Sequence, residues 1–174
     1  MKTLVIHPYD PTTDMLRAIY EGEDWLVIDD NISKSQLKKH IVDHDRIIML
    51  GHGTENGLYG YNRFIIDSSY VYLLRDKIVF CVWCNADQFV YKYNLKGFYT
   101  GMIISEEIEA NMYKVNTVEG EVDTSNTVFS DAVRLAVNAK DEDMVGIVKE
   151  NYVGEGEVFE FNRERIYHTC LNED

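Results

Sequence analysis

A histidine and a cysteine each follow a short apolar stretch of the sequence. His52 comes just after the run Arg46–Leu50, and Cys84 comes just after the run 77–82. A thiol beside an imidazole can pass its proton to the ring, and the thiolate is the nucleophile that acyl transfer needs. These two residues therefore predict a catalytic pair in which Cys84 attacks an acyl group and His52 accepts and returns the proton.

The spacing of the two residues predicts that they lie close together. His52 and Cys84 are 32 positions apart, and the interval contains one predicted helix, at 67–76. That content suits a single right-handed crossover between two neighbouring parallel strands. In open α/β sheets the ligand crevice lies outside the carboxyl ends of the strands, so both side chains are expected to face it.

Backbone amides near the pair suggest an oxyanion hole. Gly51 and Gly53 flank His52, which allows a sharp turn and leaves the Gly53 N–H uncovered. The N–H of Cys84 is expected at the start of the helix Ala86–Tyr93, where amide groups point outward. The amides of Gly53 and Cys84 are therefore the predicted oxyanion donors.

Short apolar strands alternate with helices along the chain. The pattern predicts a mostly parallel sheet covered by helices on both faces, that is, an α/β three-layer sandwich. Strands are predicted at 3–7, 24–28, Arg46–Leu50, 77–82 and 97–104, with a late strand at 157–167. Helices are predicted at 12–20, 33–42, 67–76, Ala86–Tyr93, 105–113, 124–138 and 141–153. In the second of these, Ser33 is the predicted N-cap and Gln36 completes a capping box. The stretch 54–62 is rich in Gly and Asn and reads as a loop, and 115–123 is either a hairpin or an excursion.

Composition limits the classes of partner. The chain has 174 residues, 45% of them hydrophobic, which predicts one domain spanning 1–174. Its net charge of −13 disfavours nucleic acid and anionic membrane surfaces as partners. Because the sequence has neither a long apolar span nor a signal-like start, and carries only three cysteines, we expect a cytoplasmic protein with reduced thiols.

Two segments resemble a known family. IIMLGHG around His52 and IVFCVWCNA around Cys84 are similar to the strand-His-Gly and strand-Cys motifs of the caspase-like cysteine peptidases, which include gingipain, clostripain, legumain and CHAT domains. The resemblance implies peptide-bond hydrolysis with Cys84 as nucleophile, His52 as general base and acid, and the Gly53 and Cys84 amides as oxyanion donors. It implies no cofactor and no metal. Trp83 departs from the family pattern, in which many members have a small or acidic residue before the cysteine.

The same resemblance indicates where substrate would bind. In this family the pocket for the residue before the scissile bond draws on segments that correspond here to 8–14 and 104–107. Candidate substrate-binding residues are therefore Asp10, Ser105 and Glu106, with Asn85 beside the thiol. A carboxylate from Asp10 or Glu106 in that pocket would select Arg or Lys. Asp10 could equally be a turn residue, and Ser105 and Glu106 could equally open a helix.

Other interpretations of these residues remain open. Cys81 and Cys84 form a C-x-x-C pair, but residues three apart on a strand point to opposite faces, which argues against a redox or zinc site. The glycines of 51–60 lack phosphate-binding spacing. His7, His40, His44 and His168 have no evident partners. The alternatives to a peptidase are a peptide-binding or scaffold relative with little turnover, and a small-molecule binding domain of flavodoxin type.

Overall fold

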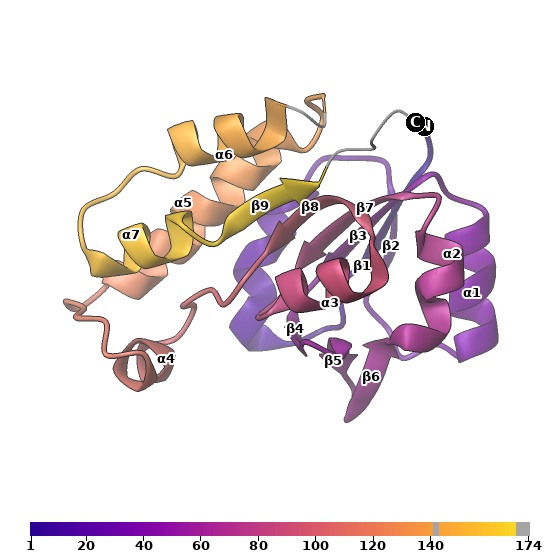
Figure 1. Cartoon of the computed structure of the whole chain (residues 1–174), viewed down its shortest axis with the longest axis horizontal. Helices are drawn as coiled ribbons and strands as arrows, with labels where there is room; N and C mark the ends of the chain where they lie inside the picture. The colour runs from indigo at the N-terminus through magenta and orange to yellow at the C-terminus, as the bar shows by residue number, and fades with distance from the viewer. Residues whose placement is uncertain (141–142, 170–174) are drawn as a thin grey trace.

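A computed structural model of the chain describes residues 1–140 and 143–169 and places a mixed sheet at its centre (Figure 1). Within these residues the strand order is β2-β1-β3-β7-β8-β9, and every neighbouring pair is parallel except β8 and β9. The strands are β1 (Thr3–Ile6), β2 (Leu26–Ile28), β3 (Arg46–Leu50), β7 (Ile78–Val82), β8 (Lys96–Thr100) and β9 (Ile166–Thr169). The fold is α/β with a mostly parallel sheet, as the sequence predicts.

Helices cover both faces of this sheet. One face carries α1 (Lys34–Val42), α2 (Val71–Leu74) and α3 (Ala86–Tyr93), and the short turn η2 (Ser68–Tyr70) leads into α2. The other carries the 3-10 helix η1 (Pro11–Ile19), α5 (Glu121–Ala136) and α6 (Met144–Asn151). The helices α4 (Glu107–Met112) and α7 (Glu157–Arg163) extend beyond the strands, at the left of Figure 1.

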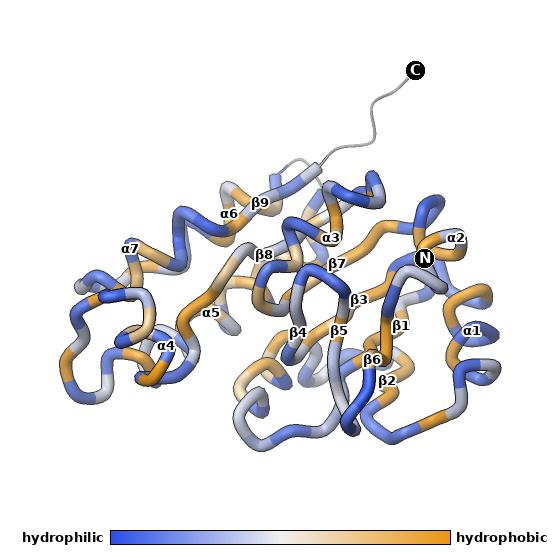
Figure 2. The backbone as a smooth tube through the Cα atoms, turned by 60° about the horizontal axis from the view of Figure 1, so that its bottom comes forward, coloured by the Kyte–Doolittle hydropathy of each residue, from blue (hydrophilic) through white to orange (hydrophobic). Residues whose placement is uncertain are grey.

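Alternate residues of β3 explain the two helical layers. Ile47 and Met49 pack into the core beneath α1, α2 and α3, whereas Ile48 and Leu50 pack into the core beneath η1, α5 and α6. All four side chains are fully buried, and β3 and β7 are coloured as hydrophobic in Figure 2. A continuous apolar run is the pattern expected of a parallel strand covered on both faces.

The prediction that β3 and β7 are neighbouring parallel strands is confirmed. The strands pair in parallel, with Leu50 opposite Val82 at their carboxyl ends. The Gly51 N–H also donates to the Val82 carbonyl at 3.1 Å. The segments that follow the two strands therefore start side by side at one edge of the sheet.

The local signals of two predicted helices also appear in the structure. Ser33 caps α1, and its capping box with Gln36 is complete. Asp10 caps η1 by accepting the Thr12 N–H, and Pro11 opens the helix. The predicted helix at 12–20 is therefore present, but with 3-10 geometry over Pro11–Ile19.

The prediction of a loop at 54–62 is wrong. The chain forms a three-stranded antiparallel sheet of β4 (His52–Thr54), β5 (Gly57–Gly60) and β6 (Arg63–Ile66). Tyr61 and Asn62 both have positive φ between β5 and β6, as a two-residue hairpin turn requires. Asn56 and Asn62 thus lie in the turns of a small sheet that begins at His52, whereas Gly57 and Gly60 lie in β5.

The prediction of a strand at 157–167 is also wrong for most of its length. Residues Glu157–Arg163 form α7, and only the end of the segment belongs to β9. Val158, Phe159 and Asn162 are buried, a helical spacing that the charged residues between them obscure. The strand predicted at 97–104 ends at Thr100, and 115–123 is an excursion that leads into α5 at Glu121.

The helix α5 is amphipathic rather than apolar throughout. It has 16 residues and buries Phe129, Val133 and Ala136 against the sheet, while Leu135 is exposed. Across residues 1–140 and 143–169, no helix combines the length and the apolar content that crossing a bilayer needs. Of the helix predicted at 141–153, residues 141–142 lie outside the described residues, and α6 occupies Met144–Asn151.

Candidate active site

His52 and Cys84 line the same cavity at the carboxyl edge of the sheet. The cavity has a volume of about 40 Å³, room for a few water-sized groups. Each side chain has a polar contact with another residue: Cys84 Sγ lies 3.6 Å from the Ile103 carbonyl oxygen, and His52 Nε2 lies 2.6 Å from Thr12 Oγ1. The structure thus brings the two predicted residues to one cavity, with each in a hydrogen bond outside the pair.

A tight turn presents Cys84 to this cavity. The Ala86 N–H donates to the Trp83 carbonyl at 3.3 Å, and Asn85 adopts a left-handed conformation with φ 64°. Asparagine tolerates this conformation better than most residues. Asn85 therefore shapes the turn that places the thiol just before α3, and this gives it a role other than the predicted contact with substrate.

The Cys84 thiol is protonated at neutral pH. Burial raises its pKa to about 11, and the negative charges of Glu109 and Glu106 act in the same direction. A nucleophilic thiolate at this position has to be formed by a base during the reaction, because it is not present beforehand. The general base is therefore an essential part of any chemistry here.

This protonation state predicts the pH dependence of alkylation. Labelling of Cys84 by iodoacetamide should rise about tenfold for each pH unit between pH 7 and pH 9, because only the thiolate reacts and its fraction grows by that factor below the pKa. Quenched labelling followed by peptide mass spectrometry measures the rate at this one cysteine. A rate that is already constant below pH 8 would show instead a thiolate held in the resting protein.

His52 is held from two sides. It is the first residue of β4, and its ring contacts Thr12 of η1. Its Nε2 lies 3.9 Å from Asp10 Oδ2, and the His52 side chain is 38% exposed. Hydrogen bonds from the Thr12 N–H and hydroxyl lower the pKa of Asp10, so its carboxylate is charged at neutral pH. Asp10, predicted to bind substrate or to form a turn, caps η1 and faces the imidazole.

The Gly53 backbone sits against the indole of Trp83. A Cβ on Gly53 would lie 2.1 Å from Trp83 Cδ1, so only glycine fits. Of the two predicted oxyanion donors, Cys84 lines the cavity, while Gly53 lies one residue beyond His52 on β4. Close packing against Trp83 is thus a sufficient physical reason for a glycine at position 53.

Trp83 connects β4, the strand that begins at His52, with α3, the helix that follows Cys84. The sequence analysis did not predict this role. Its Nε1–H donates to the Thr54 carbonyl at 3.0 Å, and its ring packs edge-on against Phe89 of α3 at 5.7 Å between centroids. The side chain is 2% exposed. Its unusual place before the cysteine was the available signal, because a large side chain there must pack against whatever precedes it in space.

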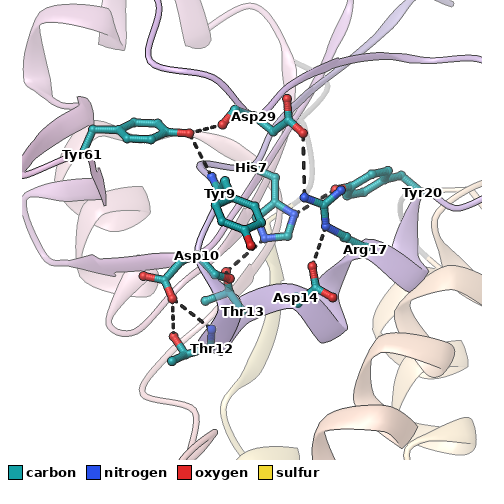
Figure 3. A network of polar contacts seen from close by, with 10 residues as sticks. All are labelled: His7, Tyr9, Asp10, Thr12, Thr13, Asp14, Arg17, Tyr20, Asp29 and Tyr61. Atoms are coloured by element: carbon teal, nitrogen blue, oxygen red, sulfur yellow. Dashed lines mark hydrogen bonds and ion pairs between the residues drawn. The ribbon is translucent and has the colours of Figure 1, made fainter.

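His7 is a second residue that sequence analysis misjudged. It lies at the end of β1, is 2% exposed, and its ring nitrogens contact Tyr20 at 3.0 Å and Thr13 at 3.1 Å (Figure 3). The expectation that it has no partner is therefore wrong. Burial, reinforced by the charge of Arg17, lowers the pKa of His7 to about 4. The neutral ring thus anchors η1, the helix that carries Thr12, to the end of β1.

The lowered pKa of His7 predicts a loss of stability in mild acid. His7 stays neutral in the folded protein down to about pH 4, whereas in the unfolded chain it gains a proton below about pH 6.5. Folding stability is therefore unaffected by His7 above pH 6.5 and falls by about 3 kcal/mol as the pH drops toward 4. Urea denaturation at pH 7.5 and 4.5 should show a smaller acid loss in His7→Gln than in the natural chain. An equal loss in both would contradict this account of His7.

The segment between β8 and α4 covers the thiol. Its backbone is clamped by Asn162 of α7, which accepts the Ile104 N–H at 2.7 Å and donates to the Ile104 carbonyl at 2.9 Å. The neighbouring carbonyl of Ile103 is the contact of Cys84. The buried side chain of Asn162 thus fixes the backbone segment that contacts the Cys84 thiol.

Ser105 and Glu106 border a second, wider opening. Ser105 lines both the small cavity and an adjoining groove of about 470 Å³, and Glu106 lines the groove. The Ser105 N–H and the Glu106 N–H both donate to Glu109, which completes a capping box at α4. The two residues therefore open a helix and also border a groove next to the proposed site.

The C-x-x-C pair is not a disulfide. Cys81 and Cys84 are free thiols; Cys81 is fully buried within β7, and burial raises its pKa. Within 1–140 and 143–169, no cluster of three or more His, Cys, Asp or Glu side chains could hold a metal ion. A zinc site would also need a second ligand pair, and the pair that the sequence offers, His168 with Cys170, includes a residue outside the described ones.

Comparison with profiles of known protein families, with curated protein sequences and with solved structures finds no match. Interpretation of the site therefore depends on its own geometry. That geometry defines an α/β protein with a thiol and an imidazole at the ends of adjacent parallel strands, lining one cavity.

Proposed function

We propose that the chain is a cysteine peptidase with a caspase-like fold, in which Cys84 and His52 form the catalytic pair. The observation that carries this proposal is their common cavity at the ends of β3 and β7. The two segments that resemble the family, IIMLGHG and IVFCVWCNA, thereby come from strands that are neighbours in the sheet. Ligand sites of α/β sheets occur at this edge.

The proposed reaction uses the thiol and the imidazole in turn. His52 takes the proton of Cys84 as the sulfur attacks the carbonyl carbon of a peptide bond. The resulting oxyanion collapses to a thioester as His52 returns the proton to the departing amine. Water, deprotonated by His52, then attacks the thioester, and a carboxylic acid and the free thiol are released. Because the resting thiol has its pKa raised to about 11, this assistance by His52 is essential.

The adjoining groove favours a basic residue in the substrate. Glu106, Glu107 and Asp123 border it, and among the residues that the structure describes no lysine or arginine lines it. Ser105 and Asn126 border both the groove and the cavity of the pair, so an extended peptide could pass from one to the other. We propose cleavage after Arg or Lys, because a carboxylate-lined opening attracts a cationic side chain.

A second candidate function is a peptide-binding relative with little turnover. It is favoured by the raised pKa of Cys84, since a thiol so protonated is a poor nucleophile without its base. The flavodoxin-type hypothesis treats the His52 and Cys84 pair as accidental, so it gives no reason for the cavity that the two residues share.

Cleavage of a peptide mixture separates these candidates. The natural chain should cut peptides after Arg or Lys, and new carboxyl ends identified by mass spectrometry give the specificity directly. Cys84→Ala should abolish cleavage, whereas Cys81→Ala leaves the reacting thiol in place and should retain it. Cleavage by the Cys84→Ala variant would overturn the proposal. Binding of the same peptides without any cleavage would favour the second candidate.

A further inference from the structure

We infer that Asp10 and Thr12 fix which nitrogen of His52 carries a proton, so that Nε2 is protonated and Nδ1 is left as the basic atom. The inference deepens the proposed function and rests on it for its catalytic consequence. Three side chains form a continuous row of hydrogen bonds: the Asp10 carboxylate, the Thr12 hydroxyl and the His52 imidazole.

The order of donors and acceptors follows from the single hydrogen of the Thr12 hydroxyl. The Asp10 carboxylate can only accept, because it is charged at neutral pH, and its Oδ1 lies 2.8 Å from Thr12 Oγ1. The hydroxyl hydrogen is therefore used toward Asp10. At 2.6 Å from His52 Nε2, the Thr12 oxygen must accept, so the ring nitrogen donates.

Asp10 and Thr12 are themselves held in place. The second contact of Asp10 is with the Thr12 N–H at 2.9 Å, so carboxylate and threonine form one rigid cap of η1 (Figure 3). The next residue, Thr13, contacts the buried ring of His7 at 3.1 Å. The 3-10 helix is thus anchored to the end of β1 at the level where Thr12 meets His52.

This arrangement gives the imidazole two separate tasks. The Nε2–H of His52 is held by Thr12. Nδ1 is then the ring atom whose lone pair can accept the proton of Cys84. When the ring becomes positively charged, Asp10 Oδ2 at 3.9 Å stabilises it through space. Thr12 and Asp10 are therefore positioning residues for the proposed base, because the Thr12 hydroxyl contacts the His52 ring and the Asp10 carboxylate faces it.

The tautomer can be observed by NMR without any assay of activity. Nitrogen-15 spectra of the imidazole in the full chain should show Nε2 protonated and Nδ1 unprotonated for His52. Removing the acceptor in Thr12→Val should speed exchange of the Nε2 proton with water by about tenfold or more, as expected on losing one good hydrogen bond. Thr12→Ser should restore slow exchange, because it keeps the hydroxyl. Thr124→Val is the matched control, because it removes a threonine hydroxyl that bonds elsewhere, to the Gly120 carbonyl.

The outcomes keep this inference separate from the proposed peptidase. A His52 ring protonated at Nδ1 in the natural chain, or unchanged exchange in Thr12→Val, would overturn the inference. If the tautomer and its dependence on Thr12 are as expected while Cys84 cuts no peptide, the inference about the ring holds and the proposed function fails. If peptides are cut and Thr12→Val cuts them at the same rate, the inferred role in catalysis fails while the peptidase stands.

Discussion

Replacing His52 with alanine should lower the rate at which Cys84 is alkylated by a peptidyl acyloxymethyl ketone, with loss of the carboxylate leaving group, by about 10²- to 10⁴-fold, the usual contribution of a general base. The reason is the protonated thiol, whose raised pKa of about 11 leaves almost no thiolate at neutral pH. The measurement is the second-order rate of covalent labelling at pH 7.5, followed by mass spectrometry of the intact chain.

A control for this variant is His40→Ala. His40 lies in α1, outside the cavity, so its loss should leave the labelling rate unchanged. The pH profile gives a further check, because labelling of His52→Ala should recover as hydroxide replaces the missing base at high pH. Equal labelling rates in His52→Ala and the natural chain at neutral pH would rule out His52 as the base.

Replacing Gly53 with alanine should destabilise the fold by about 1 to 3 kcal/mol, the cost of overpacking a well-filled site. The new Cβ would lie 2.1 Å from Trp83 Cδ1 and 2.6 Å from the Gly57 carbonyl oxygen, so the indole and the turn of the small sheet must both shift. Because His52 begins the same strand, labelling of Cys84 should also slow. Urea denaturation measures the loss of stability.

The matched control for this substitution is Gly146→Ala. Gly146 lies inside α6, and a Cβ there meets no heavy atom within 4 Å. Alanine is the better helix former by about 1 kcal/mol, so this variant should be as stable as the natural chain or more stable. If Gly53→Ala were as well tolerated as Gly146→Ala, the close contact between Gly53 and Trp83 would not exist as described.

The placement of the pair was predictable because it depends on strand order. Apolar runs before His52 and Cys84, with one helix between them, are sufficient to make β3 and β7 parallel neighbours. The small sheet β4-β5-β6 was not predictable from composition, because Gly and Asn suit both loops and hairpin turns. Positive φ at Tyr61 and Asn62 distinguishes the two, and it is a property of the folded backbone.

The contacts that hold His52 and Cys84 in place could not be predicted from the sequence pattern. Thr12 meets His52 across 40 positions, and Asn162 of α7 clamps Ile104 across 58 positions. Neither contact has a periodicity or a spacing motif. The contact of His7 with Tyr20 also has no sequence signal, because Tyr20 lies 13 positions away at the end of a predicted helix.

The most direct test of the Cys84–His52 pair is site-specific labelling by a peptidyl acyloxymethyl ketone with arginine next to the reactive group. The natural chain should take up one equivalent, and peptide mapping should find it on Cys84 rather than on Cys81 or Cys170. Labelling should be lost in Cys84→Ala and strongly slowed in His52→Ala. Labelling of Cys84 no faster than of Cys170, with no dependence on His52, would contradict the proposed catalytic pair.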